Sequence, residues 1–285
     1  MTGTGMNAVR LGLGRGWIEM KQSLTTRADQ VWLVLMNGIF IAVLWFQRDA
    51  TIPGTDVSLA LATLPSLIGM NIMLGGWMGT AQQLAVERED GTLLRAKSTP
   101  DGMVGYLVAR ITLAALSTGL GAVVFLIAGF VILDGLGAVG FVGWLQLALV
   151  FLLGMLATLP WGAIIGSIVK NSQSGFGLSF LPAMAMIAIS GIFYPISGLP
   201  GWLHPIAQVF PVYWLGLGTR AALSPDAAAA AEIGGSWRYL ETYVVLGLWA
   251  TVGLILAPRV LRRMAQRESG SVLEARRQQA MQFGN

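Results

Sequence analysis

Long stretches without a charged residue constrain this chain more than any other feature. Six such stretches separate clusters of charged residues, and each can hold a helix that crosses a bilayer, which needs about 20 mostly apolar residues. Only 11% of the 285 residues are charged, whereas an average soluble domain carries roughly 25%. The uncharged stretches are residues 30–47, 57–86, 111–133, 135–169, 171–219 and 242–258.

We therefore predict an all-α polytopic membrane protein that forms one permease-like domain over residues 1–285. The longer uncharged stretches also contain turns, because glycines or prolines interrupt them. The predicted parts are an amphipathic leader over 1–28, six transmembrane helices over about 30–47, 58–81, 106–133, 143–168, 174–195 and 240–260, a loop over 82–102, an external segment over 196–238 and a tail over 261–285.

The distribution of Lys and Arg predicts how the chain is oriented in the membrane. Fifteen of the 18 basic residues fall on one side of the six spans, and cytoplasmic loops carry such an excess. We therefore predict a protein of the cell (inner) membrane. Both termini and the loops after spans two and four are expected on its cytoplasmic side. A five-span or seven-span arrangement would mix the two groups. The basic residues on the outer side are Arg48, Arg220 and Arg238.

Several classes of function are excluded or disfavoured. The chain has no cysteine and one histidine, His204, so disulfides, iron–sulfur clusters and multi-histidine metal sites are excluded. No phosphate-binding loop of the form G-x-x-x-x-G-K-[ST] occurs, so ATP hydrolysis by this chain is not expected. No ionisable residue lies in the middle of a predicted span, which argues against proton or sodium coupling. We predict no catalytic residue, no bound cofactor or metal, and no nucleic-acid partner.

Two segments between the spans have their own patterns. The leader mixes apolar residues with arginines and places Trp17 where it can sit at headgroup level; a partly ordered basic leader is the alternative. The loop after span two is densely charged yet keeps apolar residues at helical spacing, with a break at Asp90-Gly91 and a stop before Pro100. It predicts a helix–break–helix that docks a soluble partner, or else an ordinary solvated loop.

The external segment before span six is apolar and aromatic but carries four prolines, Pro195, Pro200, Pro205 and Pro211. A continuous helix is excluded, because each proline removes a donor and clashes with the preceding turn. We expect a re-entrant helical hairpin, since irregular backbone is tolerated at membrane depth only where protein or water satisfies it. An outer loop anchored by interfacial aromatic residues is the alternative.

Taken in order, these features resemble the ABC-2 type permeases, the membrane subunits of bacterial drug, antibiotic, polysaccharide or lipid exporters. The resemblance covers nearly the whole chain. It rests on the charged loop that begins Glu87-Arg-Glu-Asp-Gly-Thr-Leu-Leu and on the outer element that begins Phe193-Tyr-Pro. The continuation Leu94-Arg-Ala-Lys97 is more basic than in many relatives.

The resemblance implies a non-catalytic transport subunit that works with two copies of a separate ABC ATPase, which holds ATP and Mg, and with a second copy or a related permease. The leader would be the elbow helix, and the loop after span two would hold the coupling helix. The implied ATPase-coupling residues are Glu87, Arg88, Glu89, Gly91, Thr92, Leu93, Leu94 and Arg95. The implied path residues are Met70, Asn71, Met73, Ser179, Met186 and Ser190, and the implied outer gate is Phe193, Pro195, Leu199, Pro200, Trp202 and Pro205.

The methionines of spans two and five favour a hydrophobic or amphipathic substrate, because methionine adapts to varied apolar shapes. They would equally suit a packed core. The expected function is therefore export of a drug, an antibiotic or a lipid-like molecule, as in multidrug or antibiotic resistance. A polysaccharide or lipid-linked glycan exporter is the alternative within the family, and a passive channel or membrane scaffold without an ATPase is the alternative from another class.

Overall fold

The computed structural model describes residues 3–51, 58–89, 92–97, 102–133, 136–169, 172–194 and 196–282. Apart from one isolated bridge between Thr51 and Ser58, these residues form helices and connecting turns. The longer helices are α1 (Gly3–Thr25), α2 (Arg27–Gln47), α3 (Leu59–Met73), α4 (Thr80–Glu89), α6 (Gly102–Ile132), α7 (Phe141–Ile168), α8 (Ser172–Ala188), α10 (Pro211–Leu223) and α11 (Tyr239–Gln282). The short elements are η1 (Leu74–Gly79), α5 (Thr92–Lys97), η2 (Leu136–Ala138), η3 (Ile196–Gly198), α9 (Leu203–Val209), η4 (Asp226–Ala231) and η5 (Ile233–Gly235).

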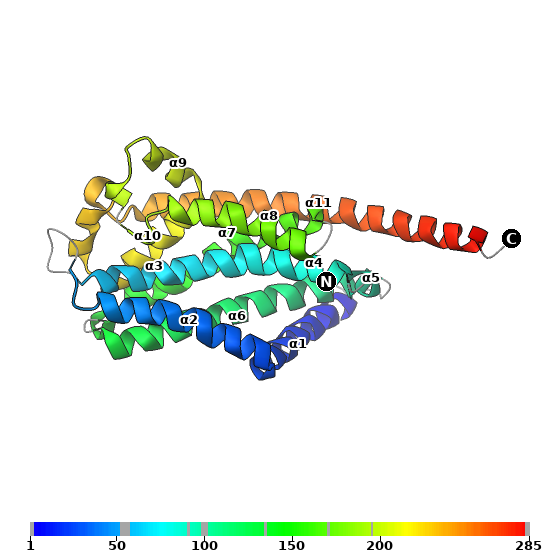
Figure 1. Cartoon of the computed structure of the whole chain (residues 1–285), viewed down its shortest axis with the longest axis horizontal. Coiled ribbons are helices and arrows are strands. Elements are labelled where there is room, and N and C mark those ends of the chain that lie inside the picture. The colour runs from blue at the N-terminus through cyan, green and yellow to red at the C-terminus, as the bar shows by residue number, and fades with distance from the viewer. Residues whose placement is uncertain are drawn as a thin grey trace.

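The long helices run side by side along one axis of the molecule (Figure 1). Helix α1 crosses them at an angle at one end, whereas α9 and α10 lie towards the opposite end. Helix α11 packs along α7 and then projects beyond the bundle as a helical tail (Figure 1). The architecture is the all-α polytopic arrangement that the uncharged stretches predicted.

Four helical segments of the described chain are long and apolar enough to cross a membrane, and they coincide with predicted spans two, three, four and six. Predicted spans one and five coincide with two shorter apolar helices, Leu33–Gln47 and Gln173–Ala188. The bundle is therefore built from four long apolar helices and two shorter ones. The four long segments are Leu59–Arg88, Gly102–Ile132, Phe141–Ile168 and Tyr239–Leu261.

The second predicted span is one continuous helical rod made of α3, η1 and α4, and it extends beyond the predicted end at residue 81. Its middle, η1, is π-helical, a rare form that is frequent at functional sites. Glycines make this segment fit: a Cβ atom on Gly75 would overlap the hydroxyl of Thr118 in α6, and one on Gly76 would overlap that of Thr158 in α7. The π-helical segment is thus wedged between α6 and α7.

Helix α10 lies inside the bundle, although its residues fall in the segment predicted to be external. All residues from 211 to 220 are buried, and α10 packs against α3, α7 and α11. Pro211 begins the helix, where its missing N–H costs nothing. A Cβ atom on Gly69 of α3 would lie 3.0 Å from the backbone of Gly216, so the two helices pack with their backbones close together.

A buried ion pair holds α10 in place. Arg220, which is 5% exposed, donates from Nε and Nη2 to the two carboxylate oxygens of Glu232 at 2.6 and 3.2 Å. Its Nη1 donates to the hydroxyl of Ser66 in α3 at 2.9 Å and to the carbonyl oxygen of Gly191 at 3.4 Å. One guanidinium therefore joins α10 to α3, to the turn after α8 and to the turn after η4.

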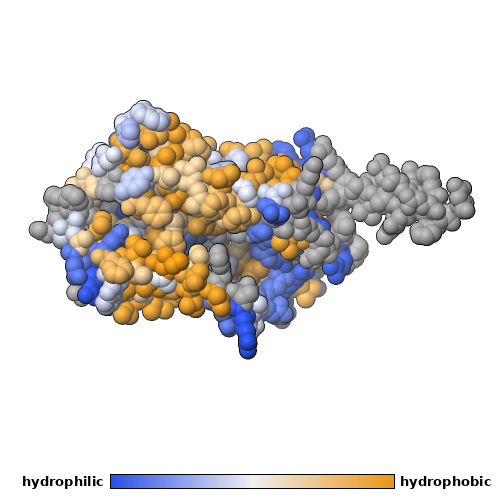
Figure 2. Space-filling model, in the orientation of Figure 1, coloured by the Kyte–Doolittle hydropathy of each residue, from blue (hydrophilic) through white to orange (hydrophobic). Residues whose placement is uncertain are grey.

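The surface agrees with a membrane environment. Figure 2 shows hydrophobic residues over the middle of the bundle and hydrophilic residues gathered towards its two ends. Large apolar side chains such as Val131, Phe141 and Leu181 are at least 70% exposed, which water would disfavour and lipid tails would not.

Candidate functional site

The helices α1, α4 and α5 and the first turns of α6 meet at one end of the bundle, which we call the charged end (Figures 1 and 2). Helix α1 lies directly on α6. A Cβ atom on Gly12 would lie 2.5 Å from the carbonyl oxygen of Gly105, and one on Gly16 would lie 2.8 Å from that of Ala109. Two glycines four residues apart therefore let α1 approach the α6 backbone.

Glu87 of α4 is buried at this end, with 8% of its side chain exposed. Its carboxylate accepts a 2.5 Å hydrogen bond from the hydroxyl of Tyr106. It also forms a 2.7 Å ion pair with Nη1 of Arg110. Both partners lie in α6, so Glu87 fixes α4 to α6 and its carboxylate is not presented to a partner protein.

Arg110 carries the connection on to α1. Its Nη2 donates to Glu19, whose other carboxylate oxygen accepts from Nε of Arg15 at 2.7 Å. A buried charge needs a partner to offset the loss of hydration, and Glu87 and Glu19 obtain theirs from one shared guanidinium. The order Arg15–Glu19–Arg110–Glu87 forms a chain of charges that spans α1, α6 and α4, and we call it the charge chain.

The neighbouring Arg88 ties α4 to a third helix. Its Nη1 donates to the carbonyl oxygens of Gly166, Ser167 and Val169 at 3.2, 3.0 and 2.6 Å. These carbonyls end α7, where backbone acceptors have no partner within the helix and a cation is favourable. Arg88 is thus a cap for α7, and the pair of residues 87–88 links α4 to α1, α6 and α7.

The short helix α5 is anchored by one apolar residue. Leu93 is 1% exposed and clusters with Leu84 of α4, Tyr106 of α6 and Met264 of α11. Arg95 is exposed and Thr92 is half-buried. Movement of α5 would therefore displace α4, α6 and α11 together, because the same buried cluster contains a residue from each.

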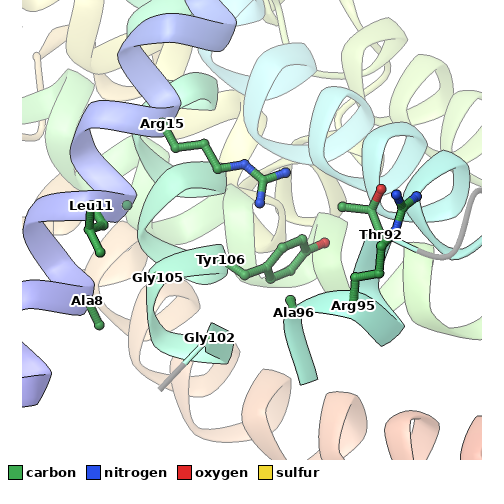
Figure 3. Close-up of a pocket in the computed structure, with 10 residues that line it drawn as sticks. Ala8, Leu11, Arg15, Thr92, Arg95, Ala96, Gly102, Gly105 and Tyr106 are labelled. Atoms are coloured by element: carbon green, nitrogen blue, oxygen red, sulfur yellow. The ribbon is translucent and has the colours of Figure 1, made fainter. Parts of the chain in front are cut away.

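A pocket of about 520 Å³ opens between α1, α5 and α6. Figure 3 shows Arg15 reaching from α1 and Tyr106 from α6 into the space beside α5, where Arg95 and Thr92 lie next to each other. The pocket is lined by Ala8, Leu11, Gly12, Arg15, Thr92, Arg95, Ala96, Gly102, Gly105 and Tyr106.

The structure thus brings five of the predicted coupling residues together at the charged end. Gly91 lies outside the described residues, and the side chains of Glu89 and Leu94 do too. The five are Glu87, Arg88, Thr92, Leu93 and Arg95.

The predicted path residues lie mainly inside the chain. Among them, only Asn71 is half-buried, and its Oδ1 has no hydrogen-bond partner among the described residues. The other five are less than 7% exposed, so they are packed within this chain and do not line an open surface. These five are Met70, Met73, Ser179, Met186 and Ser190.

The predicted outer-gate residues lie at the end opposite the charged end. Phe193 and Trp202 are 51% and 67% exposed, and Pro200 and Pro205 are exposed as well. Leu199 is half-buried and its carbonyl oxygen lies 3.1 Å from Nε2 of His204. Pro195 lies outside the described residues.

The sequence did not indicate which residues pair in the charge chain, or which residue pairs with Arg220. Glu19 and Arg15 were available as an i,i+4 pair on the leader, which is a stabilising spacing on a helix. Tyr106 and Arg110 lie one turn apart inside predicted span three, where an ionisable residue suggests a partner. No pattern in the sequence indicates that Arg220 pairs with Glu232.

Comparison with known families now identifies the chain. No curated protein matches it. The sequence profile described as "ABC-2 family transporter protein" matches residues 33–257, more than three quarters of the chain. The match contains all helices from most of α2 to the apolar half of α11, and leaves α1 and the helical tail outside. Permeases of this family are membrane subunits that partner an ABC ATPase and are not catalytic by themselves. The chain therefore belongs to the ABC-2 transporter family and is a multi-pass membrane subunit of an ABC transporter.

Proposed function

We propose that this permease exports an amphipathic drug, antibiotic or lipid-like substrate, with its charged end in the cytoplasm and its ATPase docked there. The observation that carries the proposal is the charge chain, which ends at the buried Glu87. It joins α4, next to the coupling helix α5, to α1 and α6 by ion pairs that sit beside the expected ATPase surface. The excess of Lys and Arg on this side of the spans supports its cytoplasmic location.

In this mechanism the ATPase pushes on α5. Because Leu93 of α5 is buried against α4, α6 and α11, the push is delivered to three helices as one body. Glu87 and Arg88 then pass it to α1, α6 and α7. Packed interfaces of this kind switch between discrete arrangements and do not deform gradually, which suits alternating access.

The substrate route would lie between two permease copies, each with its own ATPase subunit. Met73 and Ser179 are enclosed within the chain, so a route between copies would be lined by other faces of the same helices. Helix α8 offers the stacked rings of Phe176, which is exposed, and Phe180, which is half-buried, with centroids 5.1 Å apart. An exposed aromatic ring gives apolar contact, which suits an amphipathic substrate.

The proposal is tested by co-expressing the chain with its ATPase subunit and measuring whether the two co-purify and hydrolyse ATP. We expect a stable complex for the native chain and a weakened one for Arg95→Glu, because Arg95 is an exposed basic residue of α5. The matched control is Arg48→Glu, an exposed arginine at the opposite end, which should co-purify normally. A chain that never retains an ATPase would contradict the proposal and favour a passive channel or a scaffold.

A further inference from the structure

We propose that Arg238 is a latch, a side chain that holds the short helix α9 against α10 and α11 at the end of the molecule opposite the charged end. Arg238 immediately precedes α11, and its side chain is 22% exposed. Its Nη1 donates to Oε1 of Gln208 in α9 at 2.7 Å, and its Cζ lies 4.8 Å from the ring centroid of Trp214 in α10. One side chain thus joins α9 and α10 to the start of α11.

The backbone at Arg238 is poorly suited to an arginine. Its φ is +46°, and no other non-glycine residue in the described part of the chain has a positive φ; this left-handed region is costly for residues with a long side chain. The carbonyl oxygen of Arg238 accepts from the amide of Thr242 at 3.0 Å, so Arg238 stands at the N-terminus of α11. An oxygen-bearing side chain is preferred there and a positive charge is unfavourable. Since neither the backbone nor the helix end favours arginine, we assign its role to the contacts that its side chain makes with other helices.

Helix α9 is attached to the other helices at one end. Figure 1 shows it outside the row of long helices. Among the described residues, the hydrogen bonds that tie α9 to other elements all end at Gln208 and Val209. The indole of Trp214 donates to the carbonyl oxygen of Gln208 at 2.7 Å, and the indole of Trp249 in α11 donates to that of Val209 at 2.9 Å. Of these ties, the one from Arg238 reaches a side chain of α9, so it is the one that a change of α11 can break without unfolding the backbone of α9.

Helix α11 connects this latch to the charged end. It continues through Pro258 as one helix from Tyr239 to Gln282, and its residue Met264 belongs to the buried cluster that contains Leu93 of α5. A rigid helix carries a displacement from one end to the other. A push on α5 would therefore shift the start of α11, where Arg238 lies, and release α9. The use of this release to let a substrate leave rests on the proposed export function.

The absence of cysteine from the sequence allows a direct test. Ala207 of α9 is 1% exposed, so Ala207→Cys in the purified chain in detergent should react slowly with a water-soluble maleimide. We expect Arg238→Met to raise this rate about tenfold, the factor for the loss of one hydrogen bond to a charged group, because a buried site reacts through the population that opens. Arg48→Met is the matched control: the Cζ of Arg48 lies 3.9 Å from the ring centroid of Trp45 in its own helix, and its loss should leave the rate as in the native chain.

Two further variants identify the cause of the change. Gln208→Met removes the acceptor of Arg238, and combined with Arg238→Met it should react no faster than Arg238→Met alone, because the two residues share one contact. Ala157→Cys reports on a position of α7 that is 0% exposed and should stay unlabelled in every variant. A native rate in Arg238→Met, an equal rise in Arg48→Met, or a parallel rise at Ala157→Cys would overturn the latch, the last because the whole chain would then be unfolding.

The connection along α11 is tested separately in the complex co-purified with the ATPase. We expect ATP to raise the labelling of Ala207→Cys and to leave the already fast rate in Arg238→Met unchanged. A complex that hydrolyses ATP with no change in the labelling of Ala207→Cys would overturn the connection and leave the export proposal standing. A chain that retains no ATPase would contradict the export proposal, while the labelling of the chain alone would still decide whether Arg238 is a latch.

Discussion

Replacing Arg110 with methionine should destabilise the protein by about 3–5 kcal/mol, the cost of leaving a buried carboxylate without its partner. Arg110 is the only guanidinium among the described residues that pairs with Glu87, whose side chain is 8% exposed. It also pairs with Glu19, so one substitution breaks two connections of the charge chain. The measurement is heating in detergent followed by size exclusion, with the remaining folded fraction scored against temperature.

A second substitution shows whether the uncompensated charge is the cause. Arg110→Met combined with Glu87→Gln removes the buried negative charge and keeps an acceptor for Tyr106, so it should recover most of the lost stability. Arg10→Met is the matched control on the exposed face of α1. If Arg110→Met melts at the same temperature as this control, the charge chain is not a stabilising element.

Replacing Arg220 with methionine should have an equally large effect at the other end of the molecule. The Arg220 and Glu232 side chains are 6% and 7% exposed, so the loss of one partner again costs about 3–5 kcal/mol. Ser66 and Gly191 lose a donor as well, which loosens α10 from α3 and from the turn after α8. The same melting measurement reports the loss.

The control for this prediction is an exposed ion pair of the same residue types. Arg48 and Asp49 pair at 3.2 Å with side chains 39% and 86% exposed, and exposed pairs contribute at most about 1 kcal/mol. Arg48→Met should therefore change the melting temperature little. The account of α10 fails if Arg220→Met is as mild as Arg48→Met, or if adding Glu232→Met makes the single variant worse instead of better.

The fold could be predicted from the sequence because a bilayer imposes a length and a composition on every helix that crosses it. The long spans within 58–81, 106–133, 143–168 and 240–260 were found from the absence of charge alone, and the structure has apolar helices there. Their ends could not be found in this way. Span two is predicted to end at about residue 81, before the charged residues begin, whereas the helix continues to residue 89 because the charge of Glu87 is paired inside the protein.

The position of α10 could not be predicted from the sequence either. The sequence predicts an external segment over 196–238, and nothing in it indicates that α10 packs inside the bundle. There Arg220 pairs with Glu232, 12 residues further along the chain, and donates to Ser66, which is 154 residues away. Pairing at such a separation leaves no periodic signal. The four prolines did indicate that the segment is broken, and α9 and α10 are indeed two short helices joined at Phe210.

The candidate site was partly predictable for a related reason. The charged, patterned loop after span two predicted a docking element or a solvated loop, and the resemblance to ABC-2 permeases singled out Glu87, Arg88 and Leu93 within it. Their roles follow from packing that only the structure shows: a buried ion pair, a cap on α7 and an anchor for α5. The glycines of α1 carried no recognisable motif, and Gly12 and Gly16 prove to be contact points with α6.

These glycines provide the most direct test of the central claim, which is that the charged end connects the ATPase to α1 and α6. The measurement is ATP hydrolysis by the co-purified complex in lipid vesicles. A Cβ atom on Gly12 would lie 2.5 Å from a backbone oxygen of α6, whereas one on Gly14 would meet nothing within 4 Å. The account predicts that Gly12→Leu reduces hydrolysis to the rate of the ATPase subunit alone, and that Gly14→Leu hydrolyses ATP as the native complex does. Equal, native rates in both variants would contradict it.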